Sequence, residues 1–237
     1  MDQGSHMVIL VEPHPDNRAV ARTKIVTNTV SQLLWERDSD EQWRNHHKLF
    51  KTLLREPSAQ GFCGSLFEPA FHALCVGGAK FDLYPMTRQR GGTVNFTFKD
   101  DRPGSTDGSI TLKLDGKQER VLFSTDYPIT SLLANHYYQP ITSNYPSYDS
   151  FVYDPISRQI NAFQATVADK HDLASTGVKA LRDLGRRLGI NGLKIRVIVV
   201  GFGDNRIIYQ VEKELLNSLG LEVYAVWVTE KQLYPHS

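Results

Sequence analysis

Apolar and polar residues follow two different periods along this chain, one typical of helices and one typical of strands. In the first third, apolar residues recur every three to four positions, a spacing that predicts amphipathic helices. The helices predicted in this way cover residues 18–35, 40–55 and 58–76. Pro57 separates the second helix from the third, and Gly77 and Gly78 end the third. Residues 8–57 are therefore expected to form a helical extension ahead of the main domain.

After the third helix, the pattern changes to strands divided by loops rich in Asp, Gly and Pro. The segments with alternating apolar residues are KFDLYPM (80–86), TVNFTF (93–98), SITLKL (109–114) and ERVLFST (119–125). This alternation predicts an antiparallel β-meander. A short helix is expected over 131–137, and an irregular segment then leads toward residue 149.

The last third alternates helices with strands. The expected elements are a helix over 176–188, the strand LKIRVIVV (193–200), a helix over 206–219 and the strand EVYAVWV (222–228). Helix crossovers join parallel neighbours, and an uninterrupted apolar strand is expected in a sheet that is covered on both faces. The main domain, residues 58–237, is therefore predicted to be an α/β sandwich.

The segment between these regions comes closest to indicating chemistry. YDSFVYD (148–154) predicts a short strand with Asp149 near its start, and a second strand after the Asp154-Pro155 turn ends near Gln164 and Thr166. If the two strands pair as a hairpin, Asp149, Gln164 and Thr166 meet at one rim of the sheet. A metal-centred site is then expected at that rim.

The same residues have a structural interpretation, which their spacing leaves open. Asp149 follows Pro146-Ser147-Tyr148, so its carboxylate can serve a turn by accepting hydrogen bonds from nearby backbone amides. Gln164 can simply occupy a solvated strand face.

Composition indicates a globular chain without a membrane span. Of the 237 residues, 41% are hydrophobic and 22% are charged, and no apolar run approaches the roughly 20 residues that cross a bilayer. The opening MDQGSHM resembles a vector-derived leader, so residues 1–7 are set apart from the fold. Cys63 and Cys75 have mostly apolar neighbours in a predicted helix, which favours reduced core thiols of an intracellular protein.

Local basic clusters are more informative than the net charge of +1. Lys179, Arg182 and Arg186 lie on one predicted helix, where they are candidates for contacts with nucleic-acid phosphates. A solvated helix face is the other interpretation of this cluster. The electrostatics therefore permit a nucleic-acid partner without requiring one.

The order of these elements resembles the restriction-endonuclease-like, PD-(D/E)XK fold. The elements follow one another in this order: a helix with an internal glutamate, a strand preceded by an acid, a hairpin partner that ends in two polar residues, a helix and a strand. More narrowly, three segments resemble the C-terminal domains of Crinkler (CRN) effectors and retrotransposon hot spot proteins. They are SLFEPAFHALCVGG (65–78), YYQPITSNYPSYDSFV (137–152) and INAFQATVADKH (160–171). The similarity covers residues 58–237.

This resemblance implies a metal-dependent nuclease acting on DNA, in proteins delivered into host cells and directed to nuclei. Carried over by position, Glu68 looks like the helix acid and Asp149 like the central metal-binding acid. Gln164 and Thr166 take the positions of the second acid and the lysine. The implied cofactor is Mg²⁺ or Mn²⁺, held by Glu68, Asp149 and Gln164. The expected partners are DNA and a host nuclear protein, and no membrane is involved.

Two residues depart from the family pattern. Gln164 offers a metal only a neutral carbonyl, and Thr166 lacks the cationic charge that lysine brings to phosphate chemistry. Lys170 is the candidate that reaches back into the site, and His171 is a candidate acid or base. The other interpretation of Lys170 and His171 is a polar entry to the next helix.

These departures leave two functions open. One is a Mg²⁺-dependent endonuclease, and the other is a catalytically reduced module that binds DNA or a host protein. No GxxxxGK[ST] loop occurs in the sequence, so ATP hydrolysis is not expected of this chain.

Overall fold

A computed structural model shows the arrangement of the elements that carry the candidate site. It describes the backbone of residues 9–14, 17–25, 40–55, 60–88, 94–97, 108–141, 145, 147–168, 170–203, 208–211 and 221–235. Side chains are described for residues 43–55, 63–86, 108–141, 145, 147–168, 173–203 and 221–235.

An eight-stranded mixed sheet forms the body of the protein. From one edge to the other, its strands are β6 (Ile110–Leu114), β3 (Ala79–Pro85), β14 (Glu222–Val228), β12 (Lys194–Phe202), β10 (Gln159–Ala165), β9 (Ser150–Asp154), β8 (His136–Pro140) and β7 (Glu119–Phe123). β10, β12 and β14 run parallel to one another, as do β7 and β8. The other neighbours pair antiparallel. The α/β class predicted from the sequence is therefore confirmed.

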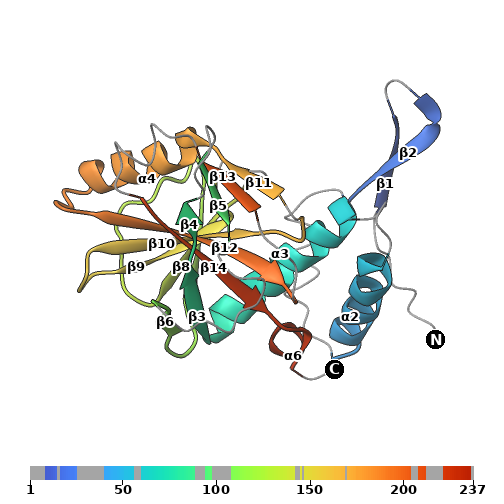
Figure 1. Ribbon diagram of the computed structural model, residues 1–237, viewed down its shortest axis with the longest axis horizontal. Helices are drawn as coiled ribbons and strands as arrows, with labels where there is room; N and C mark the ends of the chain where they lie inside the picture. The colour runs from blue at the N-terminus through green and yellow to red at the C-terminus, as the bar shows by residue number, and fades with distance from the viewer. Residues whose placement is uncertain are drawn as a thin grey trace.

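Two smaller β-structures accompany the main sheet. The first is a four-stranded sheet with the order β11 (Lys170–Leu173), β13 (Ile208–Val211), β5 (Val94–Thr97) and β4 (Thr87–Arg88). The second is an antiparallel hairpin of β1 (Ile9–His14) and β2 (Asn17–Ile25). The hairpin extends away from the main sheet (Figure 1).

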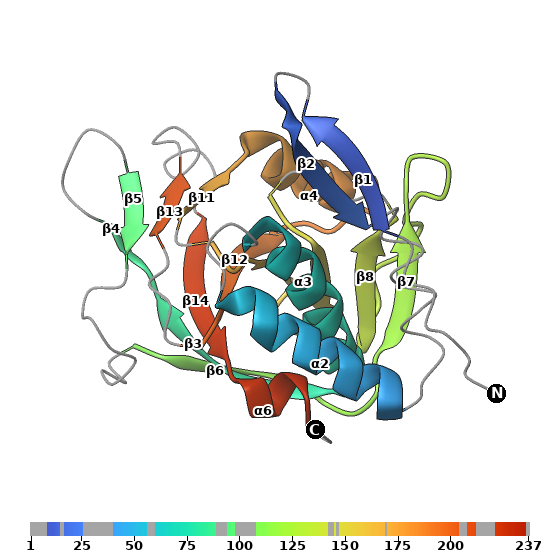
Figure 2. The same ribbon diagram turned by 90° about the vertical axis from the view of Figure 1, so that its right-hand side faces the viewer.

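Helices cover both faces of the main sheet, and β12 shows why the sequence requires this. Its residues Val197 and Val199 are buried in one core, and Ile198 and Val200 are buried in the other. The first core is closed by α4 (Ser175–Arg187), and the second by α2 (Asp40–Leu54) and α3 (Gln60–Gly77). The sheet curls around α3 (Figure 2). No helix in the described regions is long and apolar enough to cross a membrane.

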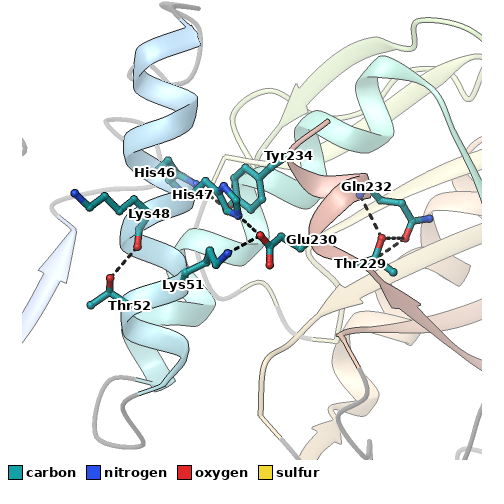
Figure 3. Close-up of polar contacts among 9 residues, drawn as sticks. All are labelled: His46, His47, Lys48, Lys51, Thr52, Thr229, Glu230, Gln232 and Tyr234. Atoms are coloured by element: carbon teal, nitrogen blue, oxygen red, sulfur yellow. Dashed lines mark hydrogen bonds and ion pairs between the residues drawn. The ribbon is translucent and has the colours of Figure 1, made fainter. Parts of the chain in front are cut away.

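A polar clamp ties α2 to the short helix α6 (Glu230–Leu233), as Figure 3 shows. Glu230 Oε1 accepts a hydrogen bond from Lys51 Nζ at 2.9 Å and lies 2.7 Å from His47 Nε2. The His47 ring stacks on Tyr234, with ring centroids 4.4 Å apart. Tyr234 is buried in the same core as Phe50 of α2. α2, which was expected in the N-terminal extension, thus shares a core with the main sheet.

The extension that was predicted to be helical over residues 8–57 contains the β1–β2 hairpin as well as α2. The helix predicted over 18–35 is wrong for 18–25, which belong to β2, and its remainder lies outside the described residues. Apolar Ala19, Val20 and Ala21 are consecutive and do not repeat at helical spacing, so the periodicity there was weak. The helices predicted over 40–55 and 58–76 are confirmed as α2 and α3.

Two further predictions were wrong and a third was wrong in part, because pairing over long distances overrides local pattern. The segment 131–137 contains no helix, and its end enters β8, whose aromatic residues suit a strand. The meander is absent, because β6 pairs with β3 while β7 pairs with β8 at the far edge of the sheet. Within the helix predicted over 206–219, residues 208–211 form β13, and 212–219 lie outside the described residues.

Candidate active site

Three strand ends meet at one end of the sheet. β9 runs antiparallel to both β8 and β10, so its start lies beside the ends of these two neighbours. Asp149 immediately precedes β9, and Gln164 lies near the end of β10. The backbone N–H of Asp149 donates to the Phe163 carbonyl at 2.8 Å, which extends the hairpin pairing by one residue. The predicted hairpin and the meeting of Asp149 with Gln164 are confirmed.

The Asp149 carboxylate connects the two strands of this hairpin. Gln164 Nε2 donates to both carboxylate oxygens, at 2.9 Å to Oδ1 and 3.0 Å to Oδ2. The backbone N–H of Ala165 donates to Oδ2 at 2.6 Å. These contacts of Asp149 cross the hairpin and do not serve a local turn. Gln164 is only 6% exposed, so the alternative interpretation, in which it occupies a solvated strand face, is wrong.

The surroundings of Asp149 favour its protonated form. Burial raises the pKa of this carboxyl well above its ordinary value, and the charge of Glu68 raises it further. The N–H of Ala165 and the amide of Gln164 act in the opposite direction, but the effect of burial is larger. Asp149 nevertheless remains partly accessible to solvent. A bound cation is the partner that would stabilise two neighbouring carboxylates in such a place.

Glu68 reaches this end of the sheet from α3. It precedes Pro69, and the helix continues past the proline to Gly77. Glu68 Oε1 lies 3.3 Å from His72 Nε2, one helical turn further on. The Glu68 side chain is 29% exposed, whereas the His72 side chain is almost completely buried. α3 therefore brings a second carboxylate within electrostatic range of Asp149 and leaves it open to solvent.

The remaining predicted catalytic residues are not joined to this pair by described contacts. Thr166 is buried, its backbone N–H donates to the Val200 carbonyl, and its Oγ1 accepts the N–H of Ala168 at 3.0 Å. Lys170 and His171 belong to β11, which pairs with β13 in the smaller sheet and ends two residues before α4 begins. Their side chains lie outside the described residues, so the expectation that Lys170 reaches the site stays a prediction.

The donor atoms at the site suit a hard divalent cation. Carboxylates of Asp149 and Glu68 and the carbonyl of Gln164 are oxygen ligands of the type that Mg²⁺ and Mn²⁺ prefer. Among the side chains that the structure describes, no three His, Cys, Asp or Glu residues form a metal-binding group by themselves. An amide oxygen or solvent would therefore have to complete the coordination.

Gln139 is a further polar residue at this end of the sheet, and the sequence pattern alone does not single it out. Tyr137 and Tyr138 point into opposite cores, so alternation places Gln139 on the α3 side, with Tyr137. Gln139 is 6% exposed, and no described group donates a hydrogen bond to its buried Oε1. The available signal was a single amide within the otherwise aromatic and apolar strand HYYQP.

Replacing Gln139 with methionine is expected to stabilise the protein without metal. Methionine has a similar volume, and an unsatisfied buried carbonyl costs roughly 1–3 kcal/mol, so we expect the free energy of unfolding to rise by about 1 kcal/mol. Urea denaturation in the presence of a chelator measures this change. A loss of stability would show that Gln139 Oε1 has a partner, such as an ordered water, in the folded protein.

The predicted phosphate-binding residues lie on α4, on the other face of the sheet. Lys179 and Arg186 are exposed and Arg182 is half-buried. Arg186 Nη1 already pairs with Asp183 Oδ1 at 2.6 Å. The Ser147 hydroxyl donates to the Ala174 carbonyl just before α4, which brings the start of this helix close to the segment leading to Asp149. Lys179, near that start, is therefore better placed than Arg186 to approach a phosphate bound at the site.

The chain was compared with protein families, with curated proteins and with solved structures. No family model, curated protein or solved structure matches it. The proposal for its function therefore rests on the residues and contacts of the site and on the resemblance of the sequence segments described above.

Proposed function

We propose that this chain is a metal-dependent nuclease domain of the Crinkler type, which hydrolyses phosphodiester bonds of DNA on a restriction-endonuclease-like fold. The observation that carries the proposal is the contact of the Asp149 carboxylate with the Gln164 amide at the end of the sheet. At the same place, the charge of Glu68 raises the pKa of Asp149. Action in the nucleus of a host cell, which the resemblance implies, belongs to the same proposal.

The order and pairing of the elements support this proposal. Along the chain, α3 is followed by β8, β9, β10, α4 and β12, with β3 to β7 inserted between α3 and β8 and β11 inserted between β10 and α4. In the sheet, β12, β10, β9 and β8 are consecutive neighbours, and β10 is parallel to β12 across the α4 crossover. The chain order of α3, β9, β10, α4 and β12 agrees with the order of elements on which the resemblance rests. This agreement supports the roles proposed for Glu68 as the helix acid and for Asp149 as the strand acid.

The candidate roles follow from the contacts. Asp149, Glu68 and the Gln164 carbonyl would hold Mg²⁺ or Mn²⁺, with Gln164 turning its amide so that the oxygen faces the ion. Such an ion, when bound, acts as a Lewis acid on a phosphate and lowers the pKa of water. Lys179, Arg182 and Arg186 would attract the DNA backbone, and Lys170 would neutralise charge on the phosphate.

A second candidate function has its own observation. Thr166 replaces the expected lysine and its hydroxyl is engaged by Ala168, while Gln164 contributes no charge. If Lys170 does not reach the site, these replacements leave a module that binds DNA or a host protein without cutting. Binding by such a module would not depend on the metal.

Cleavage of supercoiled plasmid and of linear duplex DNA tests the proposal. The protein is incubated with each substrate in Mg²⁺, in Mn²⁺ and in EDTA, and binding to the same duplex is measured by fluorescence anisotropy. We expect cutting in both metals and none in EDTA, because the water and the phosphate would not be activated without an ion.

The anisotropy result separates the two candidate functions. Binding that persists equally in EDTA, with no cutting in either metal, would replace the nuclease by the reduced module. Absence of both cutting and binding would contradict DNA as the partner.

A further inference from the structure

A continuous hydrogen-bond chain runs through the core from Glu68 to β9. Glu68 Oε1 lies 3.3 Å from His72 Nε2, and His72 Nδ1 lies 2.7 Å from the Tyr137 hydroxyl. The Tyr137 hydroxyl in turn lies 2.6 Å from Ser150 Oγ. Ser150 directly follows Asp149, so this buried chain links the elements that carry the two acids of the candidate site.

The interior members of the buried chain are shut off from solvent. His72 is 3% exposed, and Tyr137 and Ser150 are fully buried. Burial raises the pKa of Tyr137 well above its ordinary value, so its hydroxyl keeps its proton and can donate it. Each of these polar groups has a partner within the chain, and breaking one link would leave a buried group without its hydrogen bond.

The contacts allow an arrangement in which His72 Nε2 donates to Glu68 and His72 Nδ1 accepts from the Tyr137 hydroxyl. Ser150 then donates to the Tyr137 oxygen. In this tautomer, His72 directs an N–H group toward the Glu68 carboxylate.

We infer that His72 and Tyr137 are positioning residues for the metal site: they fix the Glu68 carboxylate in the orientation in which it joins Asp149 in holding the cation. This inference rests on the proposed function. A partly exposed glutamate on a helix has several rotamers, and fixing one of them has an entropic cost. Partners that orient metal-binding groups in this way typically contribute 10–100-fold in metal affinity.

A purely structural role is the competing explanation of the same contacts. In that case, the chain serves only to satisfy buried polar groups, and its loss would lower stability without affecting metal affinity. The two explanations therefore differ in one measurable quantity, the affinity of the folded variants for a metal.

Two pairs of variants separate these explanations. His72→Asn keeps a donor or acceptor near the Nδ1 position, whereas His72→Gln extends an amide toward the Nε2 position and Glu68. Tyr137→Phe breaks the middle link. Its matched control is Tyr138→Phe, because Tyr138 faces the other core and hydrogen-bonds to Ser131 and Leu133.

The readout is Mn²⁺ affinity, measured by electron paramagnetic resonance on protein that is shown to be folded by circular dichroism. We expect about tenfold weaker binding for H72N and for Y137F and no change for Y138F. H72Q should lose less affinity than H72N, because it keeps a contact with Glu68 although it loses the one with Tyr137. Y137F and Y138F should both lower the melting temperature, since each removes one buried hydroxyl.

The outcomes distinguish this inference from the proposed function. If the parent protein binds no Mn²⁺, the proposed metal site is wrong and the inference falls with it. If the parent binds but folded Y137F binds equally well, the metal site stands and the positioning role is wrong. If H72N does not fold, the comparison of Mn²⁺ affinity between Y137F and Y138F decides whether the chain has a positioning role.

Discussion

Asp149→Asn is expected to make the metal-free protein more stable while reducing its metal affinity at least about 100-fold, beyond the effect of typical outer-shell partners. Burial and Glu68 raise the pKa of Asp149, so its ionised form is unfavourable in the folded state. Asparagine removes the charge and can still accept the N–H of Ala165. Gln164 can turn its amide so that its oxygen faces the new NH₂ group.

The expected gain in unfolding free energy is about 0.5–2 kcal/mol in EDTA. This is the usual range for a stabilising substitution, here of a residue that destabilises the fold but is needed for function. The folded state binds the Asp149 proton more tightly than the unfolded chain does, so parent stability falls as pH rises through the raised pKa. The advantage of D149N should therefore be largest at neutral and alkaline pH and disappear below the ordinary value of 3.8. Thermal melts across pH measure it.

Added Mn²⁺ should reverse the order of stabilities, because ligand binding stabilises only the protein that binds it. Asp154→Asn is the matched control: Asp154 lies at the other end of β9, where it accepts hydrogen bonds from Ser157 and Ile156. D154N should keep metal-induced stabilisation and cleavage. If D149N is less stable than the parent in EDTA at neutral pH, the carboxylate has a mainly structural role in joining β9 to β10.

Phe71→Ala is expected to lower the unfolding free energy by about 3–5 kcal/mol, the usual cost of removing a fully buried phenylalanine ring. Phe71 is completely buried, and its ring lies 5.5 Å from Phe163, 5.9 Å from Phe81 and 6.5 Å from Phe67, measured between centroids. This aromatic contact holds α3 against the sheet. Urea denaturation measures the loss.

Tyr127→Ala is the control for Phe71→Ala, because it removes an aromatic ring that is 70% exposed. Its effect should stay within about 0.5 kcal/mol, as for most surface substitutions. A loss below about 1 kcal/mol for F71A would mean that the core around α3 closes over the cavity, contrary to the dense packing expected of an interior.

The central hairpin could be predicted from the sequence because its signals are local. Alternation in YDSFVYD, the Asp154-Pro155 turn and the run ending at Gln164 lie within twenty residues, and together they set the register that joins Asp149 to Gln164. α2, α3, α4, β12 and β14 were predictable for the same reason. Each has a strong period or a continuous apolar run of its own.

The rest of the fold and of the candidate site depends on contacts between residues that are far apart in the sequence. No local pattern indicates that β7 pairs with β8 and not with β6, or that His72 meets Tyr137 sixty-five residues later. Gln139 was overlooked because its importance comes from burial, which a single amide in an aromatic strand does not reveal. The two acids of the candidate site could be predicted from the sequence, but the buried hydrogen-bond chain that links their elements could not.

The position of β14 has a consequence for synthesis of the protein. A ribosome releases β3 and β6 early and β14 late, yet β14 lies between β3 and β12 in the sheet. Until Val228 has left the exit tunnel, β3 has no hydrogen-bonded connection to β12, and the apolar surface of α3 that β14 helps to cover stays accessible to chaperones. By then β8, β9, β10 and β12 have all emerged, so the nascent chain can assemble its carboxylate site before the sheet is complete.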